Sequence, residues 1–473
     1  GDYWFLNNHI RNEMKIEVAF ERIKEMKDDV KIFHWDKIDK SFIRGGISDG
    51  VNKFDIPQMY KTYMKKEIDS YGEFVRYGDA YGSQFLADAF KLYEQIIACK
   101  GELPCDNYCK YMTVTSGASS AIFLLFSYLS DKYKDYKVKM LGWQYYLFDH
   151  HCKNFSLDYQ YIISKNDNRI IPTIDEIYAE LGDSKNNIIV LTMPGNPSGE
   201  IYNYEEIVEI CKLCVANNNI LIIDKCQQEI LAQCFEYVNI GAAVLEAGAE
   251  DIVIFIDSIS KTRSIPGGRI GYIFSNSQEM FEYINYYISI IYTCPTRGLE
   301  SAIGMDIIAR CLFYVGYKKE ILSKFRYLII LDCGYKVYAE VYEKILSNKE
   351  KLEKMLNAFI LEIQQNSEQI KKNYEKARSV FQDIPGCKVT NLQGGFNFCV
   401  FLSDEKREGE ESFISKMNEL VDAKLISQCF WGATRGIKGE EGYWCRISIA
   451  VKDTVMENYL DRLRSALIEV KNL

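Results

Sequence analysis

Short apolar runs rich in β-branched residues alternate with amphipathic stretches between about residues 85 and 280. Three of these runs are NIIVLTM, NILIID and DIVIFID, and stretches of helical period such as SSAIFLLFSYLS and IVEICKLCVA lie between or before them. Strands that alternate with helices predict an α/β fold with a mainly parallel central sheet and helices on both faces. Ligands of such sheets bind at the carboxyl ends of the strands, so the turns after these runs are the first candidates for chemistry.

The pattern changes beyond about residue 310. Residues 317–381 contain no Pro and a single Gly and are rich in Lys, Glu, Leu and Ile, which predicts one long helix or a pair of helices. Strand-like pieces follow, CKVTN, FNFCVFL and WCRISIAV, with helices between and after them. We therefore expect a large domain at 58–320 and a smaller α+β domain made of 1–57 and 321–473, with the helical segment at about 317–381.

Composition and charge narrow the classes of function. The chain has 473 residues, 48% hydrophobic and 26% charged, and a net charge of -9. This balance is typical of a globular protein, and the negative charge disfavours nucleic acid or an anionic membrane as the main partner. No apolar run reaches the roughly 18 residues of a membrane span, and the first residues lack the core of a signal peptide. We expect a cytoplasmic protein.

The cysteines do not predict a disulfide framework or a metal site. There are 15, an odd number scattered over the chain, which favours reduced thiols. Cys211 and Cys214 form a CxxC inside a helical pattern, and no second CxxC completes a zinc site. The four histidines form no HExxH motif, so we expect no metal.

A lysine flanked by hydroxyl groups and an arginine follows the run DIVIFID, in SISKTRSIPGGRIGY, residues 258–272. Imine formation needs a neutral lysine, and a phosphate dianion needs a guanidinium group and hydroxyl donors. The spacing resembles the cofactor-lysine segment of fold-type I pyridoxal 5'-phosphate (PLP) enzymes, the aspartate aminotransferase superfamily with its class I/II aminotransferases. The resemblance implies an aldimine between PLP and Lys261, with Ser258, Ser260 and Arg269 binding the cofactor. A basic surface loop is the alternative.

Two further motifs occur in the order of that family. In MPGNPSG, Asn196 matches the asparagine that hydrogen-bonds the phenolic O3′ of the cofactor, and it would also border the substrate. Asp224 ends NILIID and matches the aspartate that keeps the pyridine nitrogen protonated, so that the ring can accept electrons. Gln227 stands where the family commonly has a tyrosine that shares O3′. Taken alone, PGNPSG could be a turn and Asp224 a helix cap.

The segment VTSGASSAIFLLF predicts a glycine turn that leads into a helix N-terminus. There Gly117, the backbone N–H groups of Ala118 and Ser119, and the Ser119 hydroxyl would face a phosphate with the help of the helix dipole. An ordinary helix cap is the alternative.

The segment LGWQYYLF resembles the part of the family in which an aromatic residue stacks on the cofactor ring. Alignment on the family's P-x-Y pattern selects Tyr145. The proline of that pattern is replaced by Trp143, so Trp143 and Tyr146 remain competitors.

The remaining matches concern the substrate and a second chain. Tyr77, in RYGDAYGSQFLADAF, matches a tyrosine that reaches the phosphate of the neighbouring subunit's cofactor, and CPTRG (294–298) resembles another segment that crosses into the partner's site. The resemblance therefore implies a homodimer with composite active sites. Arg446 matches the arginine that binds the substrate α-carboxylate, and Gly46 lies in a segment that resembles, loosely, the one passing over the active site.

The resemblance extends from about Arg44 to Ala450 and implies an aminotransferase that moves an amino group between an α-amino acid and an α-keto acid. Another PLP-dependent reaction of an amino acid (β-elimination, decarboxylation, cyclisation or oxidation) is the alternative. A PLP-binding regulator would need a winged helix, for which residues 1–40 are too few. Arg44, Arg297 and Arg435 are possible partners of an acidic substrate, and the many tyrosines could equally line an aromatic pocket.

Overall fold

The computed structural model describes residues 50–69, 77–228, 237–331, 343–431, 439 and 441–472, and a few residues between 23 and 34. The chain divides into two compact units. Unit 1 comprises Gly1–Phe54, Leu129–Ile201 and Glu368–Leu473, and unit 2 comprises Asp55–Tyr128 and Tyr202–Ser367. Gly46, Arg44 and Arg435 lie outside the described residues.

The larger sheet has seven strands in the order β1-β7-β6-β5-β4-β2-β3. The pairs β2–β3, β2–β4 and β5–β6 are parallel, and β7 runs antiparallel to both of its neighbours, β1 and β6. This confirms the predicted α/β fold with a mainly parallel sheet. The strands are β1 (Tyr111–Ser116), β2 (Lys137–Leu141), β3 (Tyr159–Ile162), β4 (Asn187–Thr192), β5 (Ile220–Asp224), β6 (Val253–Ser258) and β7 (Ile270–Ser275).

Several helices of unit 2 begin at a polar cap. The Ser83 hydroxyl accepts a hydrogen bond from the third residue of α5, Leu86, and Asn203 and Glu206 form a reciprocal capping box at the start of α9. The helix α5 packs against α12, α10 and β1. The helices are α4 (Gln58–Asp69), α5 (Gln84–Ala98), α6 (Gly117–Lys132), which continues into unit 1, α9 (Tyr204–Ala216), α10 (Ile240–Glu246), α11 (Gln278–Ile291), α12 (Glu300–Val315) and α13 (Lys319–Leu331).

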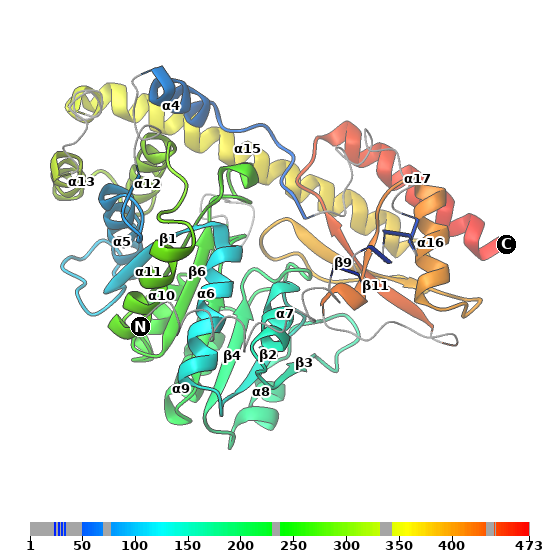
Figure 1. Cartoon of the computed structure of the whole chain (residues 1–473). Coiled ribbons are helices and arrows are strands. Elements are labelled where there is room, and N and C mark those ends of the chain that lie inside the picture. The colour runs from blue at the N-terminus through cyan, green and yellow to red at the C-terminus, as the bar shows by residue number, and fades with distance from the viewer. Residues whose placement is uncertain are drawn as a thin grey trace. The chain divides into compact units, whose positions relative to one another are not determined.

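Unit 1 contains a second, four-stranded sheet in the order β10-β11-β9-β8, beside which α16 packs against α17 (Figure 1). The central strand β11 is antiparallel to both β9 and β10. Besides strands of the larger sheet, unit 1 contains α7 (Leu147–Asn154), α8 (Ile174–Leu181), β8 (Lys388–Val389), β9 (Asn397–Ser403), α16 (Glu410–Val421), β10 (Ile426–Ser427), β11 (Gly442–Ser448) and α17 (Asp453–Asn472).

The predicted helical stretch at 317–381 contains α13 and the long helix α15 (Lys349–Gln382), drawn in yellow in Figure 1. Apolar residues recur every three or four positions along α15 and are buried, which makes the helix amphipathic. They include Leu352, Leu356, Phe359, Ile363, Ile370, Tyr374, Ala377 and Phe381.

The seven strands of the larger sheet come from residues 111–275, inside the predicted large domain, and β8 to β11 come from residues 388–448, inside the predicted small domain. The boundaries of the compact units differ from the predicted domain boundaries, because residues 129–201 belong to the same unit as the C-terminal part. The predicted boundaries at 58–320, 1–57 and 321–473 stay a prediction.

A disulfide between Cys99 and Cys105 corrects the expectation that the thiols are reduced. Cys99 caps the end of α5, and the chain turns back through Lys100 and Gly101, both at positive φ, so that the two Cα atoms lie 6.3 Å apart. An odd total of cysteines does not exclude such a local pair. In the part of the chain that the structure describes, no helix has the length and apolar character that crossing a membrane requires.

A buried ion cluster connects three segments of unit 2. Asp306 of α12 lies 2.8 Å from Nε of Arg263 and 3.0 Å from Nε of Arg310, and it accepts a hydrogen bond of 2.5 Å from the Tyr60 hydroxyl of α4. Burial alone would raise the pKa of Asp306, but the two guanidinium groups outweigh it and hold the pKa below its ordinary value. The cluster thus fixes the turn after β6, which carries Arg263, to α12.

We expect Asp306→Asn to lower the free energy of unfolding by about 3–5 kcal/mol at pH 7, because Arg263 and Arg310 would stay buried without a counter-charge. The stabilisation is present above the unfolded-state pKa of about 3.9 and is lost as the pH falls through the lower folded-state pKa. The difference between variant and wild type should therefore shrink in acid. Denaturant unfolding measures it, with Asp167→Asn, an exposed carboxylate, as control. Equal stabilities of wild type and Asp306→Asn at pH 7 would contradict this role.

Candidate cofactor site

The register of the sheet brings three strand ends of unit 2 to one edge. Gly271 of β7 is paired with Thr115, near the end of β1, and with Ser258, the last residue of β6. Asp224, the last residue of β5, is paired with Ile256 of β6, two residues before Ser258. Paired residues of parallel strands face the same side of a sheet, and the side chains alternate along each strand. Asp224 and Ser258 therefore lie near each other on the same face.

The turn between β1 and α6 leaves room for a guanidinium group. Gly117 has a φ of 78°, and a Cβ atom there would lie 2.5 Å from Nη2 of Arg269. Arg269 donates hydrogen bonds to the carbonyl oxygens of Ser116, at 3.2 Å, and Pro266, at 3.3 Å. Its exposed side chain thus lies at the N-terminus of α6 with Gly117, Ala118 and the following Ser119. Unpaired N–H groups at a helix N-terminus beside a guanidinium group fit a phosphate.

Lys261 lies in the turn that follows β6. The N–H of Arg263 donates to the carbonyl oxygen of Ile259 at 3.1 Å, which closes the turn around the lysine. Ser260 is buried and Lys261 is half-buried. Because Arg263 is also paired with Asp306, the turn is tied to the protein core directly after the lysine.

Asp224 is a buried carboxyl group, with 5% of its surface exposed. The Cys226 N–H donates to it at 3.0 Å. Burial raises the pKa of Asp224, and the hydrogen bond from Cys226 opposes this only in part. Among the described residues no ion pair joins Asp224 to a cation, so a protonated ring nitrogen fits as its partner. Gln227 is buried in the same turn.

In unit 1, the structure brings Asn196 and Arg446 together. Oδ1 of Asn196 accepts hydrogen bonds from Nη1 of Arg446, at 3.1 Å, and from Nδ2 of Asn397, at 3.4 Å. The guanidinium carbon of Arg446 lies 5.5 Å from the centre of the Trp431 ring. Gly50, at a φ of 67°, comes so close that a Cβ atom would lie 2.7 Å from Nη2 of Arg446. The structure thus places the amide of Asn196 next to a guanidinium group, a group that can bind a carboxylate.

The turn with the candidate aromatic residues is also fixed inside unit 1. Buried Gln144 donates to the carbonyl oxygen of Leu141 at 2.8 Å and accepts a hydrogen bond of 2.5 Å from the Thr192 hydroxyl, at the end of β4. The Tyr145 and Tyr146 rings are in edge contact, with centroids 4.7 Å apart. Both tyrosines and Trp143 are half-buried, so the choice of Tyr145 as the stacking residue stays a prediction.

The two segments expected to reach a second chain lie side by side in unit 2. Nη1 of Arg297 donates to the carbonyl oxygen of Tyr77 at 3.0 Å, and the Gly78 N–H donates to Sγ of Cys294 at 3.3 Å. Arg297 is itself paired with Glu300, at 3.0 Å. The Tyr77 residue is 80% exposed, which is unusual for a large aromatic residue.

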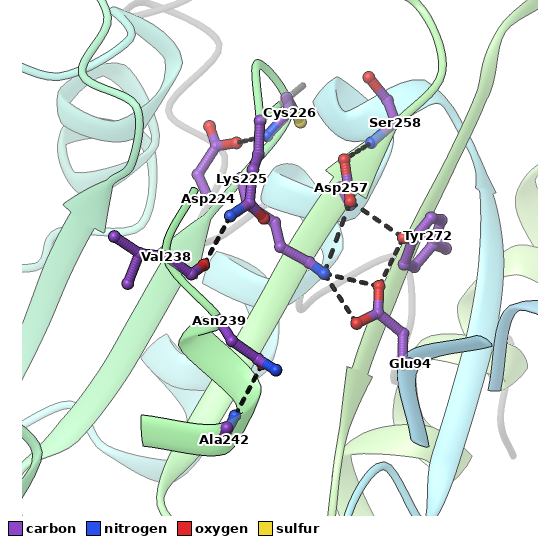
Figure 2. Close-up of polar contacts among 11 residues, drawn as sticks. Glu94, Asp224, Lys225, Cys226, Val238, Asn239, Ala242, Asp257, Ser258 and Tyr272 are labelled. Atoms are coloured by element: carbon purple, nitrogen blue, oxygen red, sulfur yellow. Dashed lines mark hydrogen bonds and ion pairs between the residues drawn. The ribbon is translucent and has the colours of Figure 1, made fainter. Parts of the chain in front are cut away.

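A buried polar cluster of Glu94, Lys225, Asp257 and Tyr272 lies at the same strand ends (Figure 2) and was not predicted. A weak signal exists in the sequence, since Lys225 and Asp257 are charged residues at the ends of two apolar runs. Glu94 and Tyr272 carry no such signal. Gly50 and Trp431, which contact Arg446, were missed as well.

Comparisons with known proteins identify the family of the chain. Residues 46–463 match the model of the family "Aminotransferase class I and II". An aspartate aminotransferase of Bacillus sp. (strain YM-2) is 32% identical over 93 residues, 20% of this chain and 23% of that protein. An aspartate aminotransferase of Sulfolobus acidocaldarius is 24% identical over 258 residues, 54% of this chain and 60% of that protein. The aligned segments thus cover less than two thirds of either relative.

Solved structures resemble the whole fold. An aromatic aminotransferase from Pyrococcus horikoshii OT3 has a TM-score of 0.66 and 17% identity, over 91% of this chain and 96% of that one. An aspartate aminotransferase from Rhizobium meliloti has a TM-score of 0.64 and 16% identity, over 89% of this chain and 90% of that one. At such identities the likeness shows the fold.

We expect Gly117→Ala to weaken binding of PLP to the apo-protein about 10- to 100-fold, the loss for one hydrogen bond to a charged group. The added Cβ would displace the Arg269 guanidinium, and the positive φ adds strain. Fluorescence titration with PLP measures the affinity. Gly267→Ala is the matched control, since a Cβ at Gly267 has no heavy atom within 4 Å. Equal affinities of both variants would show that Gly117 is not part of the phosphate cradle.

Proposed function

The chain belongs to the class I and II aminotransferase family, and from this premise we propose that it is a PLP-dependent enzyme that moves an amino group between an α-amino acid and an α-keto acid. The observation that carries the proposal is the Arg269 guanidinium packed on Gly117 at the N-terminus of α6. Arg269 ends the same turn that carries Lys261, so one short segment supplies both a phosphate ligand and an amine.

The residues of unit 2 are proposed to bind the cofactor. Arg269, the Ser258 and Ser119 hydroxyl groups, and the N–H groups after Gly117 would hold the phosphate. Ser260 would border the same turn. Bound PLP supplies an aldehyde and a ring that accepts electrons.

The proton chemistry is proposed for Lys261 and Asp224. Lys261 would carry the cofactor covalently, and its Nζ, once released, would accept the proton from Cα of the substrate. Asp224, a buried carboxyl group without a paired cation among the described residues, would keep the ring nitrogen protonated. Gln227 would lie near O3′ in place of the tyrosine that is common in the family.

The residues of unit 1 are proposed to orient the substrate. Arg446 would bind the α-carboxylate with its guanidinium group, and Asn196, to which it is hydrogen-bonded, would donate to O3′. Tyr145 would stack on the ring, and Gly46 would contact the substrate. The expected partners are small amino and keto acids, and the cytoplasmic location stays a prediction from composition.

We further propose a homodimer with composite sites. Tyr77 is exposed and its backbone is fixed by Arg297 of the segment 294–298. On the nearby chain segment α11, the large apolar side chains of Tyr286, Ile290 and Ile291 are exposed. Exposed apolar side chains of this kind are typical of a surface that a second copy covers.

We expect the purified protein with PLP to be yellow, and borohydride to fix the cofactor on Lys261 only. Peptide mapping after reduction locates the label, and Lys261→Ala should lose most turnover while Lys212→Ala, an exposed lysine of α9, should not. An amino acid should convert the bound cofactor to its aminated form, and a keto acid should restore the aldehyde form. A label on another lysine would refute the assignment, and no recovery with any keto acid would refute transamination.

Mixing two impaired variants tests the dimer. If Tyr77 acts in the partner's site, a dimer of one Lys261→Ala and one Tyr77→Phe chain has one intact site. Random exchange of equal amounts should then restore about a quarter of wild-type activity. Lys261→Ala mixed with Arg269→Ala is the matched control and should restore nothing, because both residues serve the site of their own chain. Equal recovery in both mixtures, or in neither, would contradict the composite site.

A further inference from the structure

The cluster of Glu94, Lys225, Asp257 and Tyr272 joins α5 to the ends of β5, β6 and β7 (Figure 2). Nζ of Lys225 lies 2.6 and 2.7 Å from the two carboxylate oxygens of Glu94, and 3.7 Å from Oδ2 of Asp257. The Tyr272 hydroxyl lies 2.7 Å from Oε1 of Glu94 and 2.9 Å from Oδ2 of Asp257. The four polar side chains thus form one connected cluster in which the Lys225 ammonium group contacts both carboxyl groups.

Aromatic rings enclose the cluster. Nζ of Lys225 lies 5.7 Å from the ring centre of Phe255 and 5.6 Å from that of Phe274. The Phe90 ring stacks on Tyr272, with centroids 4.2 Å apart. In these surroundings charges interact strongly, and replacing such a cluster by apolar residues would cost no stability in general. Its value therefore lies in the geometry that it imposes.

That geometry is transmitted to the proposed cofactor residues. Lys225 directly follows Asp224, and its N–H donates to the carbonyl oxygen of Ile256 at 2.9 Å. Asp257 directly precedes Ser258 and accepts a hydrogen bond of 2.7 Å from the Ser258 N–H. Side chains alternate along strands, so Asp224 and Ser258 share one face of the sheet, while Lys225 and Asp257 share the opposite face. Lys225 and Asp257 are therefore each adjacent in the chain to a proposed cofactor residue, Asp224 or Ser258.

If both carboxyl groups are ionised, the cluster has too few hydrogen-bond donors for the short contacts between its oxygen atoms. The Tyr272 hydroxyl has one hydrogen but lies within hydrogen-bond distance of two carboxyl groups. When it donates to Glu94, Oδ2 of Asp257 faces an oxygen lone pair at 2.9 Å unless Asp257 carries a proton and donates it to Tyr272. With that proton, Glu94 and Lys225 form a neutral pair, and no net charge is buried.

We propose that the cluster of Glu94, Lys225, Asp257 and Tyr272 is a positioning device that holds Asp224 and the turn of Lys261 in place while Asp257 is protonated and hydrogen-bonded to Tyr272. This inference rests on the proposed function for the role of Asp224 and Lys261, whereas the shared proton is a property of the chain itself.

The titration of Asp257 is consistent with the arrangement. Burial raises the pKa of Asp257 to about 7. Lys225 and the hydrogen bonds with Ser258 and Tyr272 oppose the rise, and Glu94 adds to it. The groups that face Asp257 are Lys225 after β5, Glu94 of α5, Tyr272 of β7 and the neighbouring thiol of Cys226, whose own pKa is raised by burial and by Asp224 and Asp257. Protonated Asp257 is thus the positioned state below this pKa, and the positioning is lost as the pH rises through it.

The first experiment uses the wild-type apo-protein. Infrared difference spectra between pH 6 and pH 8 should show the carbonyl stretch of a buried protonated carboxyl group that disappears at the higher pH. Asp257→Asn should lack this titrating band, and Asp251→Asn, an exposed carboxyl group just before β6, should keep it. Absence of the band in the wild type, or its persistence in Asp257→Asn, would overturn the shared proton.

The second experiment follows the absorbance of PLP bound to Lys261 as a function of pH. Asp257→Asn keeps a neutral side chain of the same shape, so it should bind PLP with wild-type affinity. Its midpoint for the change in absorbance should differ from that of the wild type by about one pH unit or more, because the charge near Asp224 no longer changes. Asp251→Asn should titrate like the wild type. The same midpoint in all three proteins would overturn the positioning role.

Two outcomes separate this inference from the proposed function. If the wild type binds no PLP, the proposed function is wrong, and the positioning role falls with it even if the infrared band behaves as expected. If PLP binds and is fixed on Lys261 but the Asp257→Asn midpoint is unchanged, the proposed function stands and only the positioning role is wrong. Lys225→Met leaves Glu94 buried without a counter-charge, so neither experiment depends on that variant.

Discussion

The register of β1, β7, β6 and β5 is the constraint on which the site depends. Antiparallel β7 lies between two strands that run in the same direction, and Gly271 in β7 meets the ends of both. A Cβ atom at Gly271 would lie 2.6 Å from the backbone nitrogen of Ala118, so glycine is what allows the turn after β1 to approach this closely. A slip of one residue would turn Asp224 and Ser258 to the opposite face, and the turn of Lys261 would lose its place relative to the proposed phosphate ligands.

Buried ion clusters fix the two ends of the lysine-bearing segment. Before it, Asp257 belongs to the cluster with Lys225 and Glu94, and after it, Arg263 is paired with Asp306. Such clusters are expensive to bury, and a core of apolar residues would be as stable. Directional hydrogen bonds, unlike apolar contacts, define one position for each partner. The turn is proposed to present the amine of Lys261 next to a phosphate, and Asp257 and Arg263 fix this turn at its two ends.

The sequence predicts those parts of the molecule whose pattern lies within a short segment, or whose motifs occur in the order that the family shares. The runs NIIVLTM, NILIID and DIVIFID became β4, β5 and β6 because unbroken apolar runs suit strands buried on both faces. The resemblance assigns both Asn196 and Arg446 to the substrate, but it did not predict the hydrogen bond between them, which joins residues 250 positions apart. The cluster at Lys225 joins residues 131 and 178 positions apart, and each of them alone is an ordinary charged or aromatic residue. The disulfide was missed for another reason, since a count over the whole chain cannot detect two cysteines that a tight turn brings together.

The two compact units separate two kinds of recognition. The proposed phosphate ligands, the lysine and Asp224 belong to unit 2, whereas Arg446 and Asn196 belong to unit 1. Within unit 1, Arg446 and Asn196 are hydrogen-bonded to each other, and Asn196 is also hydrogen-bonded to Asn397 at the start of β9. The groups proposed for the substrate carboxylate and for O3′ are therefore one connected element. A shift of the Arg446 guanidinium group would act directly on the amide of Asn196 through the hydrogen bond between them.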